Sequence, residues 1–315
     1  MTVALAKRAT AAPRARVVSA RARGAVGFVM ALPPIIFISV FVGFPIVLAF
    51  GFSLGMVGGL NSTVALIGQG IHRATAWWGT LAAYQEMLTS PRFLLDLLVT
   101  VVVTVVSTVV VIFLALGIGL YLRLNGGVIA RVLSGLAVVP LFIPVVIASW
   151  SIFSFYSATG FLQSVFAQFG ASFPVWSYTM VAIVIGSVWT SLPFAVLMVS
   201  SGLQGVPDAL IETARDAGAG FARIVVSVLI PLASVPILIA TTFTAIGVLG
   251  SFTVPYFTGP TSPTMLGVAM SNYFTAFNQP QQAVVAAFIV FAIASGIAAV
   301  YVRSNFRSAR EPGRS

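Results

Sequence analysis

The sequence predicts an all-α integral membrane protein with six transmembrane helices. Hydrophobic residues make up 59% of the 315 residues and charged residues only 7%, whereas a soluble domain is about 45–50% apolar and about 25% charged. The apolar residues gather in six runs long enough to cross a bilayer, which takes about 20 residues. Each run is expected to be helical, because a helix satisfies its own backbone hydrogen bonds in lipid.

The six runs follow one another along almost the whole chain. They cover residues 27–54, 93–122, 133–155, 178–203, 224–254 and 283–302. Prolines interrupt several runs. A proline within a span frees a backbone carbonyl group, which a neighbouring helix or a cavity must then satisfy. Alternatively, these prolines only kink the helices. The uncharged segment 255–282, before the last run, is expected to contain a short, partly inserted helix.

The distribution of Lys and Arg predicts which side of the membrane each segment faces. With a cytoplasmic N-terminus, fourteen of the sixteen basic residues lie inside, and only Arg73 and Arg92 lie outside. This asymmetry follows the positive-inside rule. We therefore expect both termini in the cytoplasm, with basic tails at residues 1–24 and 304–315 around a membrane domain at residues 25–303.

The composition excludes several kinds of chemistry. The chain has no cysteine and one histidine, His72, so a thiolate nucleophile or a Cys-based metal site is impossible, and we expect no metal site. The only lysine, Lys7, does not follow a glycine-rich loop, so no Walker A nucleotide site is available. The net charge of +10 does not indicate nucleic-acid binding, because the basic residues lie at the ends of apolar runs. We expect neither an enzyme nor a cofactor in this chain.

One polar segment, residues 205–223, separates the fourth and fifth runs. It holds every charged residue between positions 132 and 302, namely Asp208, Glu212, Arg215, Asp216 and Arg223. Leu210, Ile211 and Ala214 recur at helical spacing and predict an amphipathic helix. Pro207 suits the first turn of this helix, and Gly218 is expected to end it in a left-handed conformation.

This segment resembles the signature of ABC-importer permeases: Glu-Ala-Ala, three residues, Gly, nine residues, then Ile-x-Leu-Pro. Glu212, Ala214, Gly218 and Pro231 occupy the matching positions, while Thr213 replaces the first Ala. In that family the segment is a cytoplasmic coupling helix that docks into a groove on a separate ATPase. The resemblance implies coupling roles for Leu210, Ile211, Glu212, Ala214, Arg215, Asp216 and Gly218. Leu210, Ile211 and Ala214 would be the apolar face inside the groove.

The resemblance also implies the function and the partners. The chain would be the permease subunit of an importer in the bacterial inner membrane, forming half of a solute pathway with an identical or sister permease. Two ATPase subunits would bind ATP and Mg, and an external binding protein would deliver the solute. Segment 255–282 would either contact that binding protein or be a solvated connection.

The expected solute is polyamine-like, because segment 251–263 and the last third of the chain resemble the spermidine and putrescine branch. Permeases for sugars, glycerol phosphate, ferric iron or phosphonates are the alternatives. An ion-coupled secondary transporter is the alternative of another class. Such transporters often use ionisable residues near the bilayer midplane, and the six runs contain no charged residue there.

A few polar and aromatic side chains are candidates for the solute pathway: Asp96, Ser151, Trp189, Thr190 and Ser251. Trp189 lies mid-span, outside the interfacial belts where Trp is usual. Serine and threonine in spans more often bond their own helix or a neighbour. Asp96 is either a functional charge at membrane depth or an interfacial partner of Arg92, four residues earlier on the same helix face.

Overall fold

The computed structural model describes residues 20–310, and the side chains of residues 28–303. In this range every regular element is helical and no strand occurs, which confirms the all-α prediction. The chain divides into two compact units, Met1–Phe50 and Gly51–Ser315. Most of the predicted tail at residues 1–24, and the end of the tail at 304–315, lie outside the described residues.

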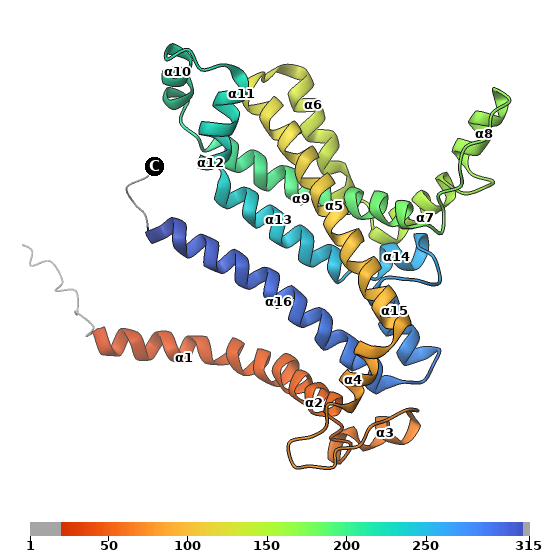
Figure 1. Ribbon diagram of the computed structural model, residues 1–315. Helices are drawn as coiled ribbons and strands as arrows, with labels where there is room; N and C mark the ends of the chain where they lie inside the picture. Colours follow the sequence, from red (N-terminus) through yellow and green to blue (C-terminus); the bar gives the residue numbers. More distant parts are fainter. Residues whose placement is uncertain (1–19, 311–315) are drawn as a thin grey trace, which may run out of the picture. The chain divides into compact units, whose positions relative to one another are not determined.

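The first unit contains most of the first predicted span. α1 (Ala20–Ile38), a π-helical turn (Ser39–Gly43) and α2 (Phe44–Ser53) follow one another directly (Figure 1). Residues Phe28–Ser53 are long and apolar enough to cross a membrane.

Three long helices form the core of the second unit. α5 (Pro91–Leu124), α9 (Met180–Gln204) and α13 (Ser234–Leu249) pack against one another (Figure 1). α13 packs closely on α9 at Gly202, where an added Cβ atom would lie 2.6 Å from the ring of Pro236. Small residues allow such close packing of membrane helices, where van der Waals contact drives association.

Hydroxyl groups are buried among these three helices. Their oxygen atoms have no hydrogen-bond partner within the described residues, and they belong to Thr104, Ser107 and Thr108 of α5, Ser187 and Ser200 of α9, and Thr244 of α13. The α5, α9 and α13 contacts therefore combine aliphatic packing with hydroxyls that are not committed to a partner.

The third predicted span is bent. α6 (Gly127–Val138) continues into a 3-10 turn (Val139–Phe142), and this segment meets α7 (Val145–Phe155) at 107°. The break falls at Ile143 and Pro144, because proline has no N–H to donate and its ring excludes the preceding turn.

The fifth predicted span is bent in the same way. α11 (Phe221–Ile224), a π-helical turn (Val225–Leu229) and α12 (Ile230–Leu232) meet α13 at 73°. The break at Ala233 lies between Pro231 and Pro236. The described residues thus contain four unbroken helices that could cross a membrane, and six spans if each bent pair counts as one.

Shorter helices connect the spans. They are a 3-10 turn (Gly59–Asn61), α3 (Ser62–Ile67), α4 (Ala82–Thr89), α8 (Phe161–Gln168), α14 (Thr253–Thr258) and α15 (Leu266–Thr275). The long helix α16 (Pro280–Arg310) then forms the last span. The expected short helix within residues 255–282 is therefore present as α15. It packs against α16 and α5.

Candidate functional site

The polar segment between α9 and α11 forms the predicted helix, α10 (Asp208–Asp216). Gly218 follows it with φ +80°. The N–H of Gly218 donates to Arg215 O at 2.8 Å, and the N–H of Ala219 donates to Ala214 O at 2.9 Å. This is the Schellman arrangement, which satisfies the last carbonyl groups of a helix. The predicted helix end at Gly218 is confirmed.

α10 has one face packed on its own chain and one face exposed. Ile211 is only 4% exposed and packs in a cluster with Leu203 and Ile224, while Ala214 is partly buried against the same cluster. The prediction that Ile211 belongs to a partner-facing surface is therefore wrong, because this side chain fills the core beneath α10. Leu210, at 44% exposed, is the large apolar side chain of α10 that remains on the outer face, beside exposed Glu212, Arg215 and Asp216.

Arg123, at the end of α5, forms hydrogen bonds and an ion pair with the start of the polar segment that contains α10. Its Nε donates to Leu203 O at 3.0 Å, and a terminal nitrogen donates to Val206 O at 2.8 Å. The same guanidinium forms an ion pair with Asp208, in the first turn of α10. Sequence reasoning missed Arg123. Its only signal was an arginine ending an apolar run, and the partners lie about eighty residues away in the chain.

A cavity of about 580 Å³ lies between α5, α7 and α9. Its wall is mostly aliphatic, and it includes Ser151, Tyr156 and Trp189. The structure thus brings together Ser151 and Trp189, two of the five predicted pathway residues. None of the lining residues carries a charge, so the cavity suits an uncharged group with an apolar face.

Two other predicted residues do not line this cavity. The Thr190 hydroxyl donates to Gly186 O in its own helix at 3.0 Å, which is the usual role of threonine in a span. Ser251 lies against α15, where a Cβ atom added to Gly267 would be 2.3 Å from the Ser251 carbonyl oxygen. The backbone of Ser251 therefore takes part in close packing.

Asp96 is 2% exposed and holds the start of α15. Its Oδ1 accepts from the N–H of Thr264 at 2.8 Å. The Thr100 hydroxyl donates to Asp96 O at 2.7 Å and accepts from the N–H of Leu266 at 2.8 Å. The first N–H groups of a helix lack partners within it. Thr100 satisfies the N–H of Leu266, the first residue of α15, and Asp96 holds Thr264 in the connection just before the helix.

The predicted pairing of Asp96 with Arg92 is absent from the ion pairs of the described residues. The guanidinium of Arg92 instead lies over the ring of Phe277, with 4.8 Å between its carbon and the ring centroid. The carboxylate of Asp96 turns inward because it accepts a backbone hydrogen bond there.

Comparison with known proteins identifies the family. Residues 76–308 match the family described as binding-protein-dependent transport system inner membrane component, which covers more than half of the chain. The chain belongs to this family. Members are permease subunits of ABC transporters and not enzymes, as the sequence predicted.

Curated relatives of this permease carry the names of sugar transport proteins. The sulfoquinovosyl glycerol permease of Agrobacterium fabrum is 27% identical over 231 residues, covering 70% of this chain and 74% of the relative. The trehalose/maltose permease of Thermococcus litoralis is 27% identical over 260 residues, which cover 80% of this chain and 82% of the relative. The trehalose permease of Mycobacterium tuberculosis is 28% identical over 236 residues, which cover 73% of this chain and 75% of the relative. These relatives give no support to the predicted polyamine branch.

Solved structures show the same fold. A bacterial ABC transporter that imports the polysaccharide alginate contains a chain with a TM-score of 0.71 at 15% identity, covering 92% of this permease and 97% of that chain. The alginate transporter in complex with an alginate pentasaccharide-bound periplasmic protein gives a TM-score of 0.72 at 14% identity, with 92% and 96% covered. The fold is therefore that of an ABC transporter permease.

Proposed function

We propose that this permease forms half of the translocation pathway of a sugar importer, driven by an ATPase on a separate chain. The observation that carries the proposal is α10, a short charged helix fixed between two spans with an exposed outer face. ATP and Mg would bind on the partner ATPase. The solute would arrive on an external binding protein, like the periplasmic protein in the alginate transporter complex.

The contacts of α10 support a coupling role. Ile211 joins α10 to the hydrophobic cluster that contains Leu203 of α9, and Arg123 joins it to α5. A displacement of α10 by an ATPase therefore reaches two core helices directly. Leu210, Glu212 and Arg215 are exposed and would contact the ATPase surface.

The charge distribution supports the orientation. Arg123 pairs with Asp208 of α10, Arg215 lies within α10, and Arg223 and Arg131 belong to the same two predicted inner loops. The positive-inside rule assigns these basic residues to the cytoplasm. In this orientation α4 and α15 belong to the outer side, and a second permease, identical or sister, would complete the pathway.

The cavity between α5, α7 and α9 supports a sugar as the solute. The indole of Trp189 offers an apolar face for the C–H groups of a sugar ring. The hydroxyls of Ser151 and Tyr156 can exchange hydrogen bonds with the hydroxyls of the sugar. No carboxylate lines the cavity, so a polyamine would find no counter-charge there. The names of the curated relatives point the same way.

Uptake into proteoliposomes tests this function. The chain would be purified together with the ATPase and permease that co-purify with it, and its binding protein would be added outside. We expect ATP-dependent accumulation of at least one of trehalose, maltose and sulfoquinovosyl glycerol, and none of spermidine. Uptake of spermidine without any sugar would reject the sugar assignment. ATP hydrolysis by the purified chain alone would reject the separate ATPase.

A further inference from the structure

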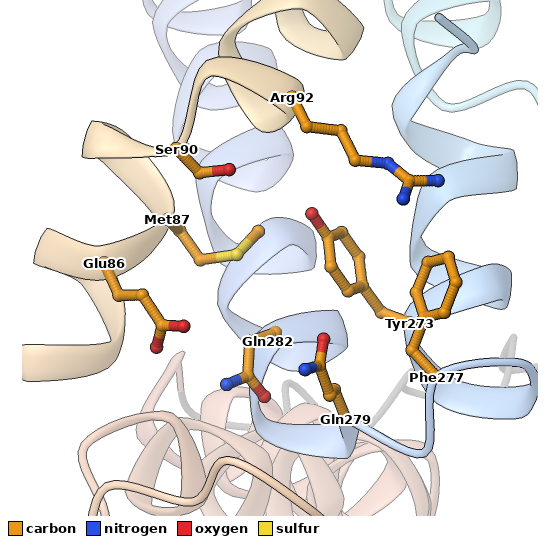
Figure 2. A pocket seen from close by; sticks show the side chains of 8 residues that line it. All are labelled: Glu86, Met87, Ser90, Arg92, Tyr273, Phe277, Gln279 and Gln282. Atoms are coloured by element: carbon orange, nitrogen blue, oxygen red, sulfur yellow. The ribbon is translucent and has the colours of Figure 1, made fainter. Parts of the chain in front are cut away.

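A second pocket lies at the end of α5 that is far from Arg123 and α10. It measures about 450 Å³ and shares no residue with the cavity at Trp189. Figure 2 shows its walls, which come from the end of α4, the start of α5, the end of α15 and the connection into α16. Five of its lining residues bear on ligand binding: Glu86, Arg92, Tyr273, Phe277 and Gln279.

The walls of this pocket are held in place by buried hydrogen bonds. Asp96 and Thr100 tie the start of α15 to α5. Gln281, fully buried, donates to His72 O at 3.0 Å and accepts from the N–H of His72 at 2.7 Å. Gln282 donates to Gly70 O at 2.8 Å. A ligand would therefore meet a preformed site and would pay little ordering entropy.

Two polar groups of the lining, on Tyr273 and Gln279, have no hydrogen-bond partner among the described residues. Tyr273 is only 8% exposed, its hydroxyl points into the pocket in Figure 2, and the described residues provide it with no hydrogen bond. A tyrosine phenol is neutral near pH 7 and can both donate and accept; burial, together with the negative charge of Asp96, raises the pKa of Tyr273 further from that range. The side-chain amide of Gln279 has no hydrogen-bond partner in the described range either.

Charged groups of both signs face the same pocket. The guanidinium of Arg92 stacks on Phe277 and forms no ion pair with any described residue. On the opposite wall the carboxylate of Glu86 contacts His72 Nε2 at 2.6 Å. One positive and one negative group leave the lining without net charge, so neither a small anion nor a small cation is favoured.

A molecule with several hydroxyl groups fits this combination. Arginine only donates and a carboxylate only accepts, whereas a hydroxyl does both and so can serve Arg92, Glu86, Tyr273 and the amide of Gln279 alike. The aromatic rings of Tyr273 and Phe277 add apolar surface for C–H groups. We propose that this pocket is an outer binding site for a neutral sugar or polyol. The proposal rests on the proposed sugar importer only for the natural identity of that ligand.

Equilibrium binding of trehalose to the purified full-length chain in lipid nanodiscs tests the site. The titrations would be made in the Trp189→Ala background, so that the cavity at Trp189 contributes little. Tyr273→Phe and Gln279→Leu each remove hydrogen-bonding capacity, and we expect about fivefold weaker trehalose binding for each. Tyr256→Phe is the matched control, because Tyr256 is exposed and lies outside the pocket; its affinity should equal that of the parent.

The titrations have clear opposing outcomes. Equal trehalose affinity in the parent, Tyr273→Phe and Gln279→Leu would overturn the proposal. So would the absence of saturable trehalose binding, or tighter binding of glutamate or spermidine. Gln279→Leu decides the matter if Tyr273→Phe does not fold. Sugar binding that responds to these variants, in a complex that transports no sugar, would reject the importer assignment and leave the outer site standing.

Discussion

The guanidinium of Arg123, at the end of α5, forms an ion pair with Asp208, at the start of α10. The same group donates to the carbonyl oxygens of Leu203 and Val206, at and just after the end of α9. The side chain of Arg123 is 15% exposed and that of Asp208 is 76% exposed. The hydrogen bonds from Arg123 to the carbonyl oxygens are therefore shielded from water, whereas the ion pair with Asp208 is largely solvated.

This difference predicts unequal effects of removing the two partners. Arg123→Met leaves two carbonyl groups without their charged donor and should destabilise the chain by about 2 kcal/mol. Asp208→Asn removes an exposed ion pair and should cost at most about 1 kcal/mol. Thermal unfolding in detergent would compare them, and a larger loss for Asp208→Asn would contradict the assignment. In the assembled transporter, Arg123→Met should also raise the ATP hydrolysed per solute imported.

The cost of replacing Gly218 should depend only on how readily the new residue adopts a positive φ, and not on the size of its side chain. An added Cβ atom meets nothing within 4 Å, but φ is +80°, a conformation that costs most non-glycine residues about 1–2 kcal/mol. Gly218→Val should destabilise and uncouple more than Gly218→Asn, because asparagine visits this region more easily. Gly220→Val is the matched control, since Gly220 has φ −70° and equal space. Equal losses of uptake in both valine variants would reject this reading.

Asp96 should be needed as an acceptor and not as a charge. Asp96→Asn keeps an oxygen for the N–H of Thr264, so stability and uptake should stay close to the wild type. Asp96→Leu leaves that buried donor unpaired and should cost about 1–3 kcal/mol. Uptake and thermal unfolding would be measured for both variants. A loss as large in Asp96→Asn as in Asp96→Leu would show that the negative charge itself matters.

Trp189 should affect transport without affecting assembly. Trp189→Ala removes aromatic surface from the cavity wall, and we expect the kcat/KM of sugar uptake to fall about tenfold. Trp189→Phe should recover part of the loss. Trp78→Ala is the control, because Trp78 is exposed and lies outside the cavity. Normal uptake in Trp189→Ala, with an intact complex, would remove this residue from the pathway.

The orientation is open to a direct test, because the chain contains no cysteine. A single cysteine at Ala217, beside the end of α10, should be shielded from an impermeant thiol reagent in intact cells. A single cysteine at Ser262 should be labelled. Both positions are exposed on the chain, so burial within the chain would not explain a difference. The opposite labelling pattern would invert the topology.

Local sequence signals predicted the elements well. The apolar runs became helices because length and composition decide that outcome in lipid. α10 and its end were predictable because helical spacing, Pro207 and Gly218 all act within a few residues. The prolines of the third and fifth runs also marked the breaks, but the bend angles of 107° and 73° depend on packing.

Contacts between distant residues could not be predicted. Arg123 and Asp208 are 85 positions apart, and Asp96 and Thr264 are 168 positions apart. No periodicity or motif connects such pairs. The inward direction of Ile211 was missed for the same reason, since an amphipathic helix shows that one face is apolar but not which body covers it.

The buried hydroxyls between α5, α9 and α13 have a mechanical consequence. No hydrogen bond between these helices depends on the unpaired groups of Thr104, Ser107, Ser187 and Thr244, so a small sliding or rolling of one helix past another breaks none at these points. Resistance to such a shift therefore comes from van der Waals packing of the side chains. α5 and α9, which also line the cavity at Trp189, can therefore shift slightly against α13 without breaking a hydrogen bond at these four hydroxyls.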